Sequence, residues 1–147
     1  MPKTIKALEQ DIIETFSKLD SIDAKYAHLF KLGEALPEMD AELKTTATQV
    51  KGCQSKLWFH LYEKEGRYYL LADSDSMVIK GIAALLARLI EGRKVEEIKQ
   101  INLDFIDQIK IWKLASERNN GLVAMLDHIK KLVDDVEVEK KMKETVS

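Results

Sequence analysis

Cysteine is almost missing from this sequence: among 147 residues only Cys53 carries a thiol, and there are three histidines. A lone cysteine cannot form a disulfide within the chain, so nothing in the sequence requires an oxidising compartment. Structural zinc sites and iron–sulfur clusters need clustered Cys or His ligands, and scattered histidines with one cysteine do not supply them. We therefore predict that the chain alone binds no metal.

The sequence also lacks an excess of positive charge, with 23 Lys and Arg against 25 Asp and Glu. Nucleic-acid-binding domains normally carry a basic excess on one face, so we expect no nucleic-acid partner. Long apolar runs are missing too: the longest, at 82–90, contains Arg88 and falls short of the about 20 residues of a membrane span. The amphipathic first residues lack the apolar block of a signal peptide, so we expect no membrane partner and a cytoplasmic location.

Apolar residues recur at steps of three and four early in the chain, which predicts amphipathic helices over 5–19 and 22–33. A stretch without a sustained period follows, and we interpret it as a loop entering an extended segment. Helices, a short β-region and further helices together predict an α+β fold, in which a small antiparallel β-sheet packs against several α-helices in a single domain. We expect this domain to span 1–133 and the charged C-terminal tail, 134–147, to fray.

The period changes to two after Ser55, which predicts strands over 55–62 and 68–72 joined by a turn at KEGR. A lone hairpin is marginally stable, so helices should cover one of its faces. The alternation places Leu57, Phe59 and Leu61 on one side and Trp58, His60 and Tyr62 on the other. Beyond the hairpin we expect a buried helix from the DSDS segment to Ile90, short helices in VEEIKQI and LDFIDQIKI, and a last helix with Leu122, Met125, Ile129 and Leu132 on one face.

Cys53 has two interpretations on the residues alone. Free cysteines are usually buried and behave as small hydrophobic residues. In contrast, Gly52 permits a tight bend and Lys51 brings a cation near the thiol, the kind of environment that makes a thiolate nucleophile. A protease-type base is missing, because His60 is about 23 Å away along an extended path. A reactive and a structural cysteine therefore stay equally open.

Two carboxylates one residue apart, Asp73 and Asp75, also have two interpretations. Such spacing occurs in metal-binding loops, but the glycine and distal glutamate of an EF-hand are missing. Acids and serines at a helix start commonly cap the helix and interact with its positive end. We favour the helix-cap interpretation.

The segment ERNNGL precedes the last predicted helix. Asn119 or Asn120 can cap that helix, and Gly121 in its first turn permits a close approach. Arg118, just before the cap, is either a solvated surface charge or a fixed guanidinium that awaits an anion or a polarised sulfur.

Four sequence blocks occur together in one order: YAHLFKLGEALPEM at 26–39, VKGCQSKLW at 50–58, ADSDSMVIKGIAALL at 72–86 and RNNGLVAMLDHIK at 118–130. This set resembles the SufE family of sulfur-acceptor proteins, which includes CsdE-like members. The resemblance covers roughly 20–132. Any one block alone would be weak, but the combination of GCQS, DSD, KG and RNNGL is specific.

The resemblance implies a function for Cys53. It would accept sulfane sulfur from the persulfide of a SufS- or CsdA-like cysteine desulfurase, stimulate that enzyme, and pass the sulfur to an iron–sulfur scaffold or another acceptor. The chain would be a sulfurtransferase-like accessory protein without a cofactor, since the pyridoxal phosphate belongs to the desulfurase. Arg118 would stabilise the thiolate or persulfide. Supporting residues would be Lys51, Gly52, Gln54, Ser55, Asp73, Asp75, Asn120 and Gly121.

Two other functions are compatible with the same residues. One is an iron–sulfur scaffold-like protein, which would need a second chain to complete a ligand set around Cys53. The other is a non-catalytic interaction module of the desulfurase system, in which the cysteine is incidental.

Overall fold

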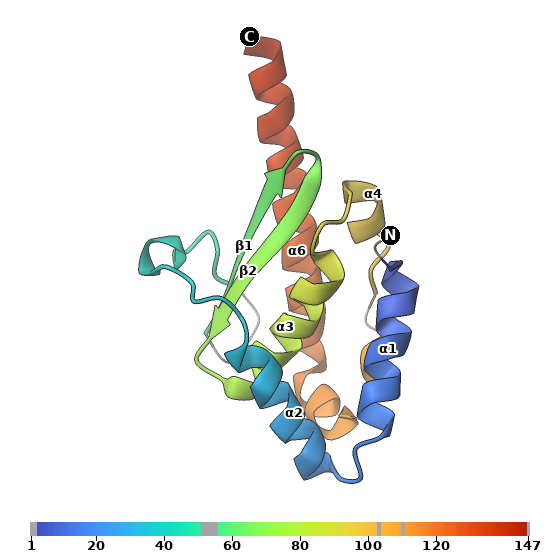
Figure 1. The fold of residues 1–147 in the computed structure, drawn as a ribbon. Coiled ribbons are helices and arrows are strands. Elements are labelled where there is room, and N and C mark those ends of the chain that lie inside the picture. The colour runs from blue at the N-terminus through green and yellow to red at the C-terminus, as the bar shows by residue number, and fades with distance from the viewer. Residues whose placement is uncertain (1–2, 51–55, 103, 110, 147) are drawn as a thin grey trace.

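The computed structural model describes residues 3–50, 56–102, 104–109 and 111–146, except for the side chains at 107, 112–123, 145 and 146 (Figure 1). Its helices and its two-stranded antiparallel sheet confirm the predicted α+β class. In chain order the elements are α1 (Ile5–Ser17), α2 (Ile22–Glu34), the 3-10 helix η1 (Ala41–Leu43), β1 (Leu57–Lys64), β2 (Arg67–Ser74), α3 (Met77–Ile90), α4 (Val95–Ile98), α5 (Asp104–Gln108) and α6 (Trp112–Val146).

The hairpin forms where the alternating pattern predicts it. Glu65 and Gly66 join β1 to β2 with φ angles of 56° and 80°, the left-handed pair that suits a two-residue hairpin turn. The first, third and fifth residues of β1 are buried, and α6 lies against β1 while α3 lies against β2. The predicted inner face is confirmed: Leu57, Phe59 and Leu61 are buried, whereas Trp58, His60 and Tyr62 are not.

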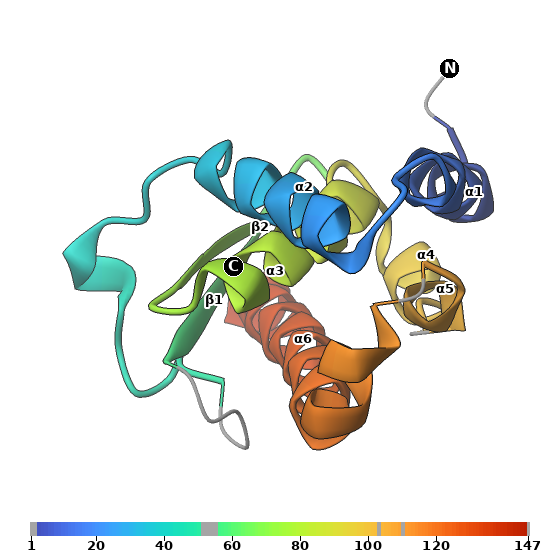
Figure 2. The same ribbon diagram turned by 90° about the horizontal axis from the view of Figure 1, so that it is seen from below.

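The central helix α3 is buried on nearly all sides, as its apolar sequence predicts, and it lies between α2 and α6 when the molecule is seen from below (Figure 2). It begins after Ser76, whose Oγ accepts the backbone N–H of Ile79 at 3.3 Å, and it ends before Gly92, whose φ is 72°. Helix α2 approaches so closely that a Cβ on Gly81 would collide with the backbone of Leu29. This contact explains why a glycine interrupts an otherwise bulky apolar helix.

Helix α6 begins earlier than the sequence indicates, so the predicted cap is wrong. The helix starts at Trp112, and its first turns contain the helix-forming stretch KLASE at 113–117. These residues favour helix strongly enough to offset the lower propensity of the two asparagines and the glycine that follow. Four residues expected around a helix start therefore lie inside α6: Arg118, Asn119, Asn120 and Gly121.

The charged segment expected to fray is also helical, because α6 continues to Val146 and its last turns extend past the hairpin turn (Figure 1). Lys140 pairs with Glu63 of β1 at 3.0 Å, and Lys99 pairs with Glu137 at 3.2 Å. These ion pairs hold part of the segment to the domain, while the domain boundary at 133 stays a prediction. In the described residues, no helix combines the length and apolar character needed to cross a membrane.

Candidate functional site

The candidate reactive residue, Cys53, lies outside the described residues together with Lys51, Gly52, Gln54 and Ser55. What the structure describes is the chain on either side. We call Thr48–Val50 the upstream anchor and Lys56–Leu57 the downstream anchor. Their contacts determine where the segment that carries Cys53 begins and ends.

The two anchors are joined to each other by the backbone. The N–H of Val50 donates to the carbonyl of Leu57 at 2.8 Å, and the N–H of Phe59 donates to the carbonyl of Thr48 at 2.8 Å. Gln49 thereby forms an antiparallel bridge with Trp58. Val50 and Leu57 are buried at 2% and 0% exposure, which shields these hydrogen bonds from water. The described residues on either side of 51–55 are therefore neighbours in space.

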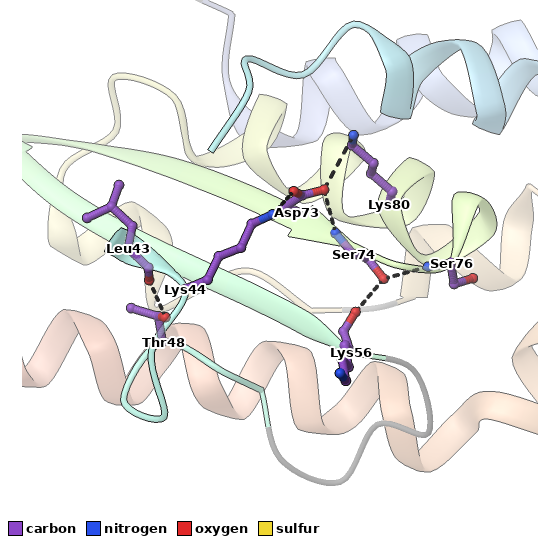
Figure 3. A network of polar contacts seen from close by, with 8 residues as sticks. All are labelled: Leu43, Lys44, Thr48, Lys56, Asp73, Ser74, Ser76 and Lys80. Atoms are coloured by element: carbon purple, nitrogen blue, oxygen red, sulfur yellow. Dashed lines mark hydrogen bonds and ion pairs between the residues drawn. The ribbon is translucent and has the colours of Figure 1, made fainter. Parts of the chain in front are cut away.

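The downstream anchor is held from the connection between β2 and α3 (Figure 3). Asp75 accepts the N–H of Lys56 through Oδ1 at 3.0 Å, and its own N–H donates to the Lys56 carbonyl at 3.1 Å. That carbonyl also accepts the hydroxyl of Ser74 at 2.7 Å, and the N–H of Ser76 donates to Ser74 Oγ at 3.1 Å. Both backbone groups of Lys56 are thus satisfied by residues about twenty positions away in sequence.

Asp73 faces the other side of this connection and is surrounded by cations (Figure 3). Its carboxylate pairs with Lys44 at 2.6 Å and Lys80 at 3.4 Å, and accepts the N–H of Ser74 at 2.8 Å. Burial by itself raises the pKa of Asp73, but the hydrogen bonds from Lys44 and Ser74 and the charge of Lys80 outweigh it and lower the pKa below its ordinary value of 3.8. Lys44 Nζ also lies 5.1 Å from the centre of the Trp58 ring.

The helix-cap interpretation of the two acids is therefore wrong. Ser76 caps α3, while Asp73 belongs to β2 and Asp75 holds Lys56. Asp75 supports the chain next to Cys53 through its hydrogen bonds with Lys56, and Asp73 forms ion pairs with Lys44 and Lys80. Among the residues that the structure describes, no group of three or more His, Cys, Asp or Glu side chains could hold a metal ion.

The upstream anchor is fixed by a compact turn after η1 (Figure 3). The Thr48 hydroxyl donates to the Leu43 carbonyl at 2.5 Å and accepts the N–H of Thr45 at 2.9 Å. The N–H of Gln49 donates to the Thr45 carbonyl at 3.0 Å. The stretch expected to be a plain loop is therefore ordered by its threonines, whose side chains replace backbone partners.

An open cleft of about 560 Å³ separates this turn from α6, and His128 contributes to its wall. From the sequence alone, a surface or half-buried structural role is expected for all three histidines. The ring of His128 packs against Phe59 with 6.3 Å between ring centres. The sequence offers no signal for the contact with the upstream anchor, because 80 positions separate His128 from Thr48. The complete lining is Thr46, Ala47, Gln49, Ala124, Asp127, His128 and Lys131.

Arg118, Asn120 and Gly121 lie in the part of α6 whose side chains the structure leaves undescribed. Further along, α6 packs against β1, the strand that begins in the downstream anchor. A direct interaction between the Arg118 guanidinium and the Cys53 thiol stays a prediction.

Comparison with known proteins adds independent findings. The family model described as "SufE: Fe-S metabolism associated domain" matches residues 10–133. The protein named "Sulfur acceptor protein CsdE" from Escherichia coli (strain K12) is 30% identical over 118 residues, covering 78% of this chain and 80% of that protein. "SufE-like protein 1, chloroplastic/mitochondrial" from Arabidopsis thaliana is 37% identical over 131 residues, which cover 88% of this chain but only 35% of the Arabidopsis protein.

A solved structure supports the fold alone. The solution structure of a hypothetical protein from Thermus thermophilus superposes with a TM-score of 0.73, covering 89% of this chain and 96% of that one. The two sequences are 19% identical, so the likeness concerns the arrangement of helices and hairpin.

Proposed function

We propose, starting from the fact that this chain belongs to the SufE family, that it is a sulfur acceptor whose reactive group is Cys53. It takes persulfide sulfur from a cysteine desulfurase, stimulates that enzyme, and passes the sulfur to an iron–sulfur scaffold or another acceptor. The pyridoxal phosphate of the reaction belongs to the desulfurase. Its place of action is the cytoplasm, although one relative carries a chloroplastic/mitochondrial name.

The transfer is an exchange between a thiolate and a persulfide. The Cys53 thiolate attacks the outer sulfur of the desulfurase persulfide, and a new S–S bond forms at Cys53 while the donor S–S bond breaks. The electron pair of the broken bond leaves with the desulfurase cysteine as a thiolate, so no net oxidation or reduction occurs. A single cysteine suffices, because a neighbouring second thiol would convert the persulfide into a disulfide and release the sulfur.

The observation that carries this proposal is the pair of anchors on either side of the only cysteine. Val50 and Leu57 hydrogen-bond to each other, and Asp75 holds Lys56 from the other direction. Fixed ends suit a thiol that must be presented to a partner, because the ends restrict the positions that the segment can reach. In this proposal Arg118 stabilises the thiolate as a permanent cation.

The test is sulfur loading measured by mass spectrometry. After incubation with a cysteine desulfurase and free cysteine, the protein gains about 32 Da, one sulfur atom, on Cys53. The Cys53→Ser variant gains nothing, and equal loading of that variant would overturn the assignment. Metal analysis of the purified protein distinguishes a sulfur acceptor from an iron–sulfur scaffold. The scaffold alternative requires stoichiometric iron or zinc that is lost in Cys53→Ser.

A further inference from the structure

His128 is positioned where α6 meets the upstream anchor. Its ring packs against Phe59 of β1, the residue whose N–H is hydrogen-bonded to the carbonyl of Thr48. The same ring shares a cleft wall with Gln49, the middle residue of the upstream anchor. The ring also forms a hydrogen bond with the backbone of Thr48, so His128 contacts both β1 and the upstream anchor.

The Nε2 atom of His128 is buried and has no hydrogen-bond partner among the described residues. A neutral imidazole tolerates this arrangement, because an unpaired acceptor costs far less than an unpaired charge. A protonated ring would carry a buried N–H and a full positive charge between Phe59 and the anchor. The packed arrangement therefore suits the neutral ring.

The charges around the ring all come from its own helix. Burial is the largest influence and lowers the pKa of His128, and the charge of Lys131 lowers it further. The charge of Asp135 and the hydrogen bond with the Thr48 backbone raise the pKa but do not outweigh burial, so the pKa stays below its ordinary value. Asp127 lines the same cleft. In the described residues, β1 contributes the uncharged Phe59, and the turn at 45–49 contains no titratable side chain.

We propose that His128 is a positioning residue for sulfur acceptance: its neutral ring packs the upstream anchor, Thr48–Val50, against α6, and protonation of the ring loosens that anchor. The proposal rests on the proposed function of Cys53, which lies three positions beyond Val50. Acidification then slows sulfur acceptance in two ways: it loosens the upstream anchor, and it protonates the thiolate of Cys53.

A first experiment tests the coupling without any sulfur chemistry. The backbone amide signals of Thr48, Gln49 and Val50 are followed by NMR during titration from about pH 8 to about pH 5, together with the His128 ring signals. These amides should shift with the midpoint of His128, and His128→Phe should remove that shift while keeping a ring against Phe59. Amides that do not respond to His128, or that shift unchanged in His128→Phe, would overturn the proposal.

A second experiment measures the initial rate of Cys53 sulfur loading by one desulfurase across the same pH range. The rate of His128→Phe divided by the wild-type rate cancels the pH dependence of the desulfurase and of the thiol. This ratio should rise about threefold or more from pH about 7.5 to about 5.5. A constant ratio would refute the positioning role, and His128→Leu provides a second variant if His128→Phe melts at a lower temperature than the wild type.

The chain offers a matched control in His28. Its pKa is also lowered, by burial and by Lys31, but it packs edge-on against Phe16 of α1 rather than against the anchors. The rate of sulfur loading of His28→Phe should depend on pH as the wild-type rate does. If His28→Phe changes the pH dependence as much as His128→Phe, the effect is not specific to the histidine beside the upstream anchor. If no variant loads sulfur, the proposed function fails while the NMR titration still decides the role of His128.

Discussion

The two ends of the hairpin are fixed to different parts of the molecule. At the turn end, the N–H of Tyr68 donates to the Arg93 carbonyl and the N–H of Gly92 donates to the Tyr68 carbonyl, both at 2.9 Å, so buried Tyr68 and Arg93 form a backbone bridge. An exposed ion pair from Lys140 to Glu63 and a hydrogen bond from Arg67 to the Gly92 carbonyl at 2.7 Å add to this bridge. At the open end, backbone hydrogen bonds join the two anchors over buried Val50 and Leu57.

The two ends differ in what their bridges join: the bridge at the turn end joins β2 to the residues after α3, and the bridge at the open end joins the described residues on either side of Cys53. Exposed ion pairs contribute little to stability, because water and salt screen them and long side chains lose freedom when they pair. Shielded backbone hydrogen bonds are stronger and also restrict direction. At each end the buried backbone bridge should therefore contribute more than the exposed side-chain contacts, and the following variants test that contrast between buried and exposed contacts.

The largest effect is expected from Phe59→Ala, which removes a fully buried ring beneath the upstream anchor. Loss of this ring should lower the free energy of unfolding by about 3–5 kcal/mol, as measured by urea denaturation. Tyr62→Ala, three positions nearer the turn end and 39% exposed, is the control and should cost about 1 kcal/mol or less. Equal losses from the two variants would contradict the contrast between buried and exposed contacts.

The next effect concerns Asp75, which holds the downstream anchor. Asp75→Ala leaves the N–H of Lys56 without its side-chain acceptor, and we expect a loss of about 1 kcal/mol in the free energy of unfolding. Hydrogen exchange at the Lys56 amide should become faster as well. Asp75→Asn keeps an oxygen at this position and should retain most of the protection; if it exchanges as fast as Asp75→Ala, the oxygen is not the acceptor that matters.

A third effect depends on pH and involves Asp73. Because its pKa is held below 3.8, the ionised carboxylate stabilises the fold above that value, and the contribution is lost as the pH falls through the lowered pKa. Asp73→Asn should therefore cost about 1 kcal/mol at pH about 5 and lose less stability on further acidification. The measurement is urea denaturation at several acidic pH values, with Asp20→Asn on an exposed aspartate as control. Wild-type and Asp73→Asn curves that stay parallel would refute this role.

The smallest effect is expected at the turn end, from Lys140→Met. This ion pair with Glu63 is exposed, so the melting temperature should stay unchanged within the error of the measurement, both in low salt and in high salt. Glu63→Gln removes the charge of the other partner and serves as the matched variant for Lys140→Met. A salt-dependent drop of several degrees in both variants would show that the turn end relies on this pair.

The parts of the fold that follow local rules could be predicted from the sequence. Alternation identifies the inner face with Phe59 at its centre, and the apolar run predicts the buried helix α3. The start of α6 could not be predicted, because Asn119 and Asn120 favour caps locally while the helix formers before them extend the helix.

The candidate site follows the same division. Cys53 stands out because it is unique and has Gly52 beside it, which are local features. The role of Asp75 requires its hydrogen bonds with Lys56, 19 positions away, and the position of Lys44 beside Asp73 requires the fold of the whole hairpin. Contacts between residues so far apart in the chain leave no periodicity or fixed spacing that can be recognised in a single sequence.

Because Val50 and Leu57 are hydrogen-bonded to each other, the chain between the two anchors could in principle be replaced by another sequence. The register of the hairpin is determined by its own turn, by the buried residues of β1 and by the contacts of Lys56, not by the five residues at 51–55. Lengthening a chain between fixed ends costs little, about 0.6 kcal/mol for each doubling. The domain is therefore a suitable host for grafted peptides, since a foreign sequence placed between these two anchors would begin and end at points that the rest of the molecule already holds together.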